Sequence, residues 1–153
     1  MRLGRIFSGL AMTVVVLALA FFAGEWHWYV GFIPPQIHTA GAVRISWTTD
    51  FILSGCGVAI FRLTAATRDA IRAQGLAFLA SARSAKRTAY EPWAQTPMRA
   101  ELLGGFSCAN VRRSLSDSVF EDASKPGSFF TMQGQSTLLV IPESKLVVFS
   151  YLR

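Results

Sequence analysis

The chain has 153 residues, of which 52% are hydrophobic and only 16% are charged, and its formal net charge is +6. This composition argues against intrinsic disorder, and the length leaves room for one small domain beyond an apolar N-terminal segment. The two histidines, His27 and His38, fall in the interfacial segment and the linker predicted below. Catalysis by a histidine base or triad therefore has little support.

The first predicted element is an apolar helix from Ile6 to Ala23, a stretch without a charged residue. As a helix it would extend roughly 27 Å, close to the thickness of the hydrocarbon part of a bilayer. Arg2 and Arg5 precede it, whereas the next Lys or Arg is Arg44. Because positive charge near a spanning helix stays on the cytoplasmic side, we expect a cytoplasmic N-terminus. The predicted location is the inner (plasma) membrane of a bacterium, with a periplasmic or extracellular domain.

A cleaved signal peptide is the alternative interpretation of this segment. Its basic region would be residues 1–5, its apolar region residues 6–17, and Ala18-Leu19-Ala20 would supply the small residues of the cleavage site. The apolar run continues through Phe21 and Phe22, beyond the roughly 7–15 residues typical of a signal peptide, which favours a retained anchor. Both interpretations export the rest of the chain.

Three parts follow from this division: residues 1–24 as the membrane segment, 25–41 as an interfacial segment and linker, and 42–153 as an exported domain. The interfacial segment contains Trp26, Trp28 and Tyr29. Amphipathic rings prefer the lipid headgroup layer, so we predict that these three side chains lie at the membrane interface. A diproline then ends any helix.

The first part of the domain is predicted to contain two strands. Apolar and polar residues alternate from Ala42, which is typical of a half-buried strand. A turn is expected at residues 49–50, another apolar segment begins at 51–53, and the glycines at 54–57 indicate a loop. Residues 58–63 are rich in β-forming side chains and predict the second strand.

Two helices are predicted next. Thr64 is a candidate N-cap for a helix over residues 65–82, in which Gly75 lies on the apolar face. Thr96 is a candidate N-cap for a short helix that Gly104-Gly105 would end. The intervening residues 83–95 comprise a basic run and an irregular segment.

The two cysteines, Cys56 and Cys108, both follow the membrane segment. An even count in an oxidising compartment predicts a disulfide, which would close a loop of roughly 52 residues. Cys108 begins a helical pattern continued by Val111, Leu115 and Val119, which predicts a third helix and directs Cys108 toward the core. Residues 53–56 also match the short pattern that precedes a lipidated cysteine, but the polar residues just before them argue against lipidation.

The C-terminal part is predicted to be a β-meander with strands at 129–133, 137–141 and 146–152. The last two strands are apolar on both faces, so we expect both faces to be covered. The predicted fold class is α+β: an N-terminal transmembrane helix, then two or three helices packed on a mainly antiparallel sheet.

Five residues are candidates for contact with a partner or with lipid. Arg83, Lys86 and Arg87 form a basic run that either completes a helix C-terminus or binds lipid headgroups or an acidic partner. Tyr90 and Trp93 either anchor an interface or fold over the core.

Neither a metal site nor a cofactor is predicted. Asp117, Glu121 and Asp122 form an acidic group, but Arg112 and Arg113 lie a turn away, so a solvated and self-paired helix face is expected. Both cysteines are predicted to be paired, and no glycine-rich phosphate loop is present.

These features favour a single-pass membrane protein whose exported domain is a binding or accessory module of an envelope complex. The expected partners are membrane lipids and a protein, and not nucleic acid. A small ligand-binding domain released by cleavage is the alternative. An anchored enzyme that uses the carboxylates or Cys56 has less support.

Overall fold

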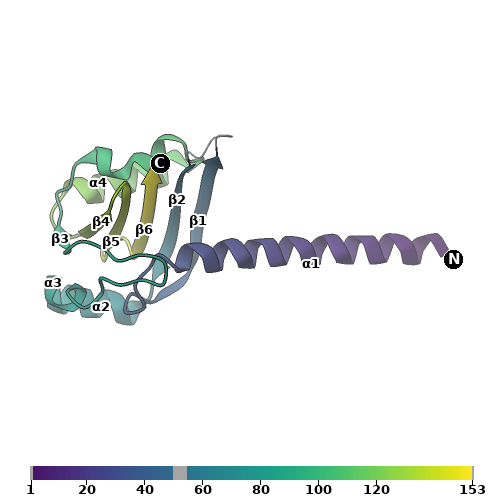
Figure 1. Ribbon diagram of the computed structural model, residues 1–153, viewed down its shortest axis with the longest axis horizontal. Coiled ribbons are helices and arrows are strands. Elements are labelled where there is room, and N and C mark those ends of the chain that lie inside the picture. Colours follow the sequence, from purple (N-terminus) through teal and green to yellow (C-terminus); the bar gives the residue numbers. More distant parts are fainter. Residues whose placement is uncertain (1, 50–54, 153) are drawn as a thin grey trace.

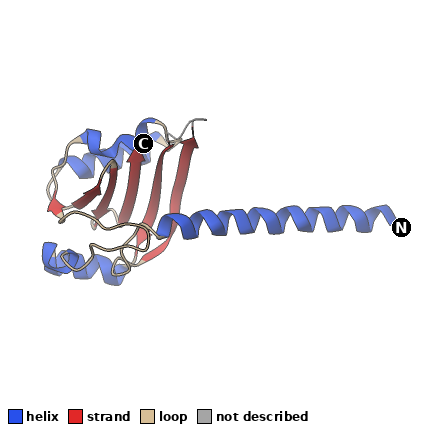
Figure 2. Ribbon diagram, in the orientation of Figure 1, coloured by secondary structure: helices blue, strands red, loops and turns tan. Residues whose placement is uncertain are grey.

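The computed structural model describes residues 2–49 and 55–152, with side chains described for 12–48 and 55–152. A long helix, α1 (Arg2–Val30), projects from one side of an α+β domain (Figure 1). In that domain a six-stranded antiparallel sheet lies between two layers of helices and loops (Figure 2). The predicted fold class is therefore confirmed, including the C-terminal β-meander. The apolar segment predicted at 51–53 lies outside the described residues.

The strands of the sheet follow the order β1-β2-β6-β5-β4-β3. Their bounds are β1 Thr39–Thr49, β2 Gly55–Leu63, β3 Ala94–Gln95, β4 Phe129–Gln133, β5 Ser136–Ile141 and β6 Leu146–Leu152. The C-terminal strand β6 is central, because it pairs with β5 on one side and with β2 on the other. In that second pairing Val58 lies opposite Ser150, so the two ends of the domain sequence meet in the middle of the sheet.

Both faces of the sheet are buried by other parts of the same chain. One face packs on the end of α1, on α2 (Ala65–Gln74) and on α3 (Leu76–Leu79). The other packs on the 3₁₀ helix η1 (Ala100–Ser107) and on α4 (Arg113–Ser124). Neighbouring residues of the central strands alternate between the two cores, as Phe61 and Ile60 do in β2. This accounts for the continuous apolar runs in β5 and β6 and confirms that both of their faces are covered.

The helix predicted over residues 65–82 is interrupted. It begins as expected at Thr64, whose hydroxyl accepts a hydrogen bond from the backbone N–H of Thr67, but α2 ends at Gln74. Gly75 has φ of +54° and ψ of −126°, a conformation that suits glycine and strains other residues. The prediction of one continuous helix is therefore wrong. A glycine on the apolar face of a helical pattern can either allow close packing or end the helix, and the sequence pattern does not distinguish the two.

Replacing Gly75 by alanine is expected to lower the free energy of unfolding by about 1–3 kcal/mol, because the added Cβ strains this backbone conformation. Space is not the obstacle, since the nearest atom is a carbon of the Phe129 ring at 3.5 Å. Urea unfolding of the full chain measures the difference. Gln74→Ala, at the exposed preceding position, is the control and should change the stability by less than about 0.5 kcal/mol. Equal stability of both variants would contradict the strain.

The short helix η1 has different boundaries from those predicted. Thr96 does not cap it: the Thr96 hydroxyl donates to the backbone carbonyl of Lys125 at 2.5 Å and accepts from the N–H of Ser128 at 3.0 Å. The helix begins at Ala100, and Gly104-Gly105 lies inside it and does not end it. Thr96 instead joins this segment to the turn before β4.

The third helix, α4, begins at Arg113 and not at Cys108. Cys108 caps the C-terminus of η1, and the N–H of Asn110 donates to the Ser46 hydroxyl at 2.8 Å. The apolar spacing from Cys108 to Val119 therefore resembles a helix although only its second half is helical. Contacts with β1 and η1, which the local pattern does not contain, hold the first half in a loop.

Strands β1 and β2 begin earlier than predicted. Strand β1 starts at Thr39, inside the expected linker, and the glycines expected in a loop at 55–57 pair with β1. Glycine disfavours strands, which is why a loop was indicated. At Gly57, however, a Cβ would lie 2.8 Å from the carbonyl oxygen of Ser46, so the close approach of β1 requires a residue without a side chain.

Candidate functional site at the base of helix α1

The last turns of α1 are part of the domain core. Tyr29 is only 5% exposed, and Ile33 and Ile37 are buried with it in the core on this face of the sheet. The ring of Trp26 meets the ring of Phe61 edge to face, with 5.3 Å between centroids. Tyr29 is therefore a core residue and not the headgroup-facing side chain expected from sequence. The expected linker differs as well, because the spacing of Tyr29, Ile33 and Ile37 lets residues 25–41 pack on the sheet.

The N-terminal part of α1 has the opposite environment. Its described side chains are exposed and mostly apolar, from Met12 at 67% to Phe22 at 66%. Among the described residues, the segment Met12–Val30 is long and apolar enough to cross a bilayer, judged by length and composition. One continuous helix thus joins an exposed, mostly apolar segment to an end that is buried in the domain.

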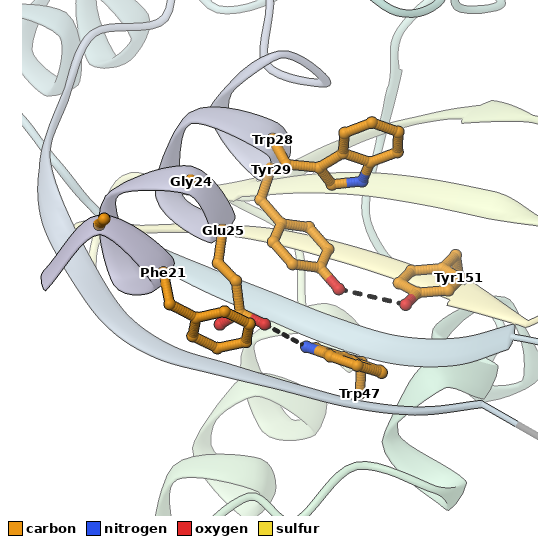
Figure 3. A pocket seen from close by; sticks show the side chains of 8 residues that line it. Phe21, Gly24, Glu25, Trp28, Tyr29, Trp47 and Tyr151 are labelled. Atoms are coloured by element: carbon orange, nitrogen blue, oxygen red, sulfur yellow. Dashed lines mark hydrogen bonds between the residues drawn. The ribbon is translucent and has the colours of Figure 1, made fainter. Parts of the chain in front are cut away.

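A pocket of about 490 Å³ lies where α1 enters the domain. Figure 3 shows that side chains from α1, β1 and β6 point toward one another in this pocket. Its lining is dominated by aromatic rings and includes one carboxylate; the residues are Ala20, Phe21, Gly24, Glu25, Trp28, Tyr29, Trp47 and Tyr151. We call it the junction pocket.

Two hydrogen bonds fix the junction pocket. The indole N–H of Trp47 on β1 donates to Oε1 of Glu25 on α1 at 2.6 Å. The hydroxyl oxygens of Tyr29 and Tyr151 lie 3.2 Å apart, within hydrogen-bond distance. The carboxylate of Glu25 therefore faces the edge of the sheet, and the Tyr29–Tyr151 pair links α1 to β6 (Figure 3).

The basic run lies against the same end of α1. The guanidinium of Arg87 stacks over the indole of Trp28, 3.5 Å from the ring centroid. The backbone N–H of Arg87 donates to the carbonyl of Gly31 at 2.9 Å, which fixes the loop to the helix end. Two residues predicted separately, Trp28 for the membrane interface and Arg87 for lipid or partner contact, are therefore in contact. Arg83 instead donates to the carbonyl of Tyr90, and Lys86 is exposed.

Tyr90 and Trp93 are not available to a partner. Both are buried, at 3% and 8% exposure. The hydroxyl of Tyr90 donates to the carbonyl of Phe32 at 2.8 Å, and the indole N–H of Trp93 donates to the carbonyl of Ala82 at 2.8 Å. Burial raises the pKa of the Tyr90 hydroxyl above its ordinary range. These rings therefore fold over the core, as one of the two alternatives predicted, and the other alternative, an anchor for a partner or for lipid, is wrong.

The acidic group on α4 is solvated, but it pairs differently from the expectation. Glu121 forms an ion pair with Lys125, and this ammonium holds the pKa of the Glu121 carboxyl below its ordinary value. Asp122 accepts a hydrogen bond from the Ser144 hydroxyl, and Asp117 is exposed. Within the described ranges, no three His, Cys, Asp or Glu side chains are grouped as a metal ion would require.

Cys56 and Cys108 form the predicted disulfide, with 6.1 Å between their Cα atoms. Cys56 lies near the start of β2, and Cys108 lies at the end of η1. The bridge fastens η1 to the sheet. It also removes Cys56 as a candidate nucleophile.

The sequence interpretation missed three residues of the junction pocket: Glu25, Trp47 and Tyr151. Glu25 is the first carboxylate after the apolar stretch, and this position indicates the end of the membrane segment but no binding site. Trp47 was predicted only as an apolar position of the first strand and Tyr151 only as part of the last strand, and neither pattern indicates a pocket. Their meeting depends on the pairing of β1, β2 and β6.

No protein-family model, curated protein or solved structure matches this chain. The junction pocket, the apolar helix and the surface of the domain are the features that bear on its function.

Proposed function

We propose that this chain is a single-pass protein of a bacterial-type inner membrane, with a cytoplasmic N-terminus. Its exported domain acts as a binding or accessory module of an envelope complex. The observation that carries the proposal is the apolar helix α1, which exposes side chains from Met12 to Phe22 and ends in the domain core. Burying one large apolar side chain is worth about 1.5–3 kcal/mol, so such a helix is strongly favoured in lipid over water.

The rigid connection between α1 and the domain supports a role at the membrane surface. Tyr29 and Ile33 belong to the core on one face of the sheet, and Arg87 is tied to the helix end. A domain held in this way cannot reorient freely relative to the bilayer. It therefore presents the same face to a neighbouring membrane protein.

The domain surface supports binding by the edge strand. Strand β1 lies at one edge of the sheet and exposes Val43 and Trp47. Exposed apolar side chains on an edge strand are typical of sites where another chain adds. The disulfide and the solvated acidic group give no comparable support to catalysis.

The topology is tested with a reporter fused after Arg153 that is active only outside the cytoplasm. We expect an active reporter and an intact mass that includes residue 1. The matched variant Arg2→Gln/Arg5→Gln should lower reporter activity, because it removes the charges that orient the helix. A cytoplasmic reporter would overturn the proposal. A mature chain that begins at Phe21 would favour a released ligand-binding domain instead.

The accessory role is tested by mild detergent extraction and crosslinking of the full chain from its membrane. We expect a species larger than the monomer, containing a second protein. The variant Trp47→Ala should reduce that species, whereas Leu76→Ala, at an exposed apolar position on α3, should not. Recovery of the chain only as a free monomer would overturn this part of the proposal.

A further inference from the structure

We infer that the junction pocket binds the ammonium group of a zwitterionic phospholipid in the leaflet that faces the domain. This binding rests on the proposed function, because it requires α1 to lie in the membrane. It adds a ligand class and a site to that proposal.

The walls of the junction pocket suit a cation. Trp28, Tyr29, Trp47 and Tyr151 line it with aromatic rings, and Phe21 adds a fifth. Cations are attracted to the faces of such rings within about 6 Å of the centroid, most strongly to tryptophan. Figure 3 shows the carboxylate of Glu25 pointing toward Trp47 and lying beside Phe21, with the Tyr29–Tyr151 pair next to them.

Glu25 supplies the negative charge. Its Oε1 accepts the Trp47 indole N–H at 2.6 Å, which holds the carboxylate at the pocket. A carboxylate has two oxygens and about four lone-pair sites, so this bond leaves capacity for an ammonium ligand. An anionic headgroup would meet repulsion at the same place.

A positive charge lies beside the pocket. The guanidinium of Arg87 stacks 3.5 Å from the centroid of the Trp28 ring, and Trp28 itself lines the pocket. Guanidinium groups bind phosphate oxygens well. The carboxylate of Glu25 bonds to the indole of Trp47, the guanidinium of Arg87 stacks on the indole of Trp28, and both indoles line the pocket. A negative and a positive group at the pocket therefore match the two charges of a zwitterionic headgroup.

The position of the pocket accounts for the lipid tail. The wall of the pocket nearest the exposed apolar part of α1 consists of Ala20, Phe21 and Gly24. The exposed apolar surface of α1 continues from there toward Met12. When the headgroup occupies the pocket, the acyl chains of the lipid can therefore lie along the apolar surface of α1. A free amine in solution has no acyl chains and would make no use of this surface.

The test is native mass spectrometry of the full chain in detergent, with one added lipid at a time. The lipids carry the same acyl chains and differ in headgroup: phosphatidylcholine, phosphatidylethanolamine or phosphatidylglycerol. We expect at least fivefold more adduct with the first two than with phosphatidylglycerol, which has the phosphate but lacks the ammonium. A preference for phosphatidylcholine over phosphatidylethanolamine would mean that the pocket recognises the methylated ammonium group. Equal binding of these two lipids would mean that it recognises the positive charge alone. Both results support the inference.

Glu25→Gln removes the charge and keeps an oxygen that accepts the Trp47 N–H. This variant should lose the headgroup preference, whereas Glu91→Gln, which removes an exposed charge elsewhere, should keep it. If Glu25→Gln unfolds, Trp47→Leu tests the same wall from the exposed edge strand. Equal adducts with all three lipids, or an unchanged preference in a folded Glu25→Gln, would overturn the inference. The same spectra give the mass of the chain. A full-length chain without headgroup preference would overturn this inference and leave the membrane anchor standing. A chain that begins at Phe21 would overturn the membrane anchor as well.

Discussion

The double variant Cys56→Ala/Cys108→Ala is expected to lose about 2–4 kcal/mol of unfolding free energy, because it removes the disulfide bridge. The bridge closes a loop whose ends are 52 residues apart. Without it the unfolded chain gains conformational freedom, and the native state loses the covalent link between β2 and the end of η1. Model-dependent chain-entropy arguments place a loop of this length near the upper end of that range.

Thermal unfolding of the oxidised and reduced full chain, followed by near-ultraviolet circular dichroism, measures this loss. Reductant should lower the midpoint for the wild type and leave the double variant unchanged, which separates the disulfide from other effects of the reagent. If reduction leaves the wild-type midpoint in place, the bridge does not hold η1 on the sheet.

Gly105→Ala is expected to cost about 3 kcal/mol or more, at the upper end of what overpacking a buried site does. A Cβ at this position would overlap the carbonyl oxygen of Gly57 and lie 2.7 Å from the Ser150 hydroxyl and 2.9 Å from the N–H nitrogen of Tyr151. Two of these three atoms are backbone atoms of paired strands, so they cannot move without disturbing β2 and β6. The hydrogen bond from the Gly105 N–H to the Ser150 hydroxyl, at 3.0 Å, would be lost as well.

The neighbouring glycine provides the matched control. A Cβ at Gly104 would meet only the Leu152 side chain, at 3.1 Å, and Leu152 is partly exposed and able to move. Gly104→Ala should therefore cost less than about 1 kcal/mol. Urea unfolding of the two variants, run side by side, gives the difference. Similar losses in both would mean that η1 does not pack on the sheet as closely as described.

The elements predicted correctly are those whose signal lies within one short segment. The apolar runs of β5 and β6, the alternation in β1 and the Thr64 cap each depend on neighbouring residues, and the structure contains all of them. The Cys56–Cys108 pair was predictable because two cysteines allow only one intramolecular bridge. Errors are concentrated at helix boundaries, where Gly75 and Cys108 each fit two local conformations.

The candidate site was only partly predictable. Trp28 was predicted at the membrane interface from its place just after the apolar segment, and Arg87 was predicted to contact lipid or a partner from its place in a basic run. The structure brings the two side chains together. Tyr29, chosen for the same reason as Trp28, points into the core, because the two side chains leave α1 in different directions. For Tyr90 and Trp93 the sequence allowed either a surface anchor or a place over the core, and their burial and their hydrogen bonds to Phe32 and Ala82 show the second.

By itself the sequence determined the fold class, the apolar N-terminal helix and the disulfide, because hydrophobic periodicity and residue counts act over short distances or need no geometry. The tertiary structure alone decided that α1 ends inside the domain and that Glu25, Trp47 and Tyr151 share one pocket. These residues come from three segments that meet only when β6 inserts between β2 and β5. That strand pairing depends on packing between residues far apart in the sequence, so the local pattern around each residue does not indicate it.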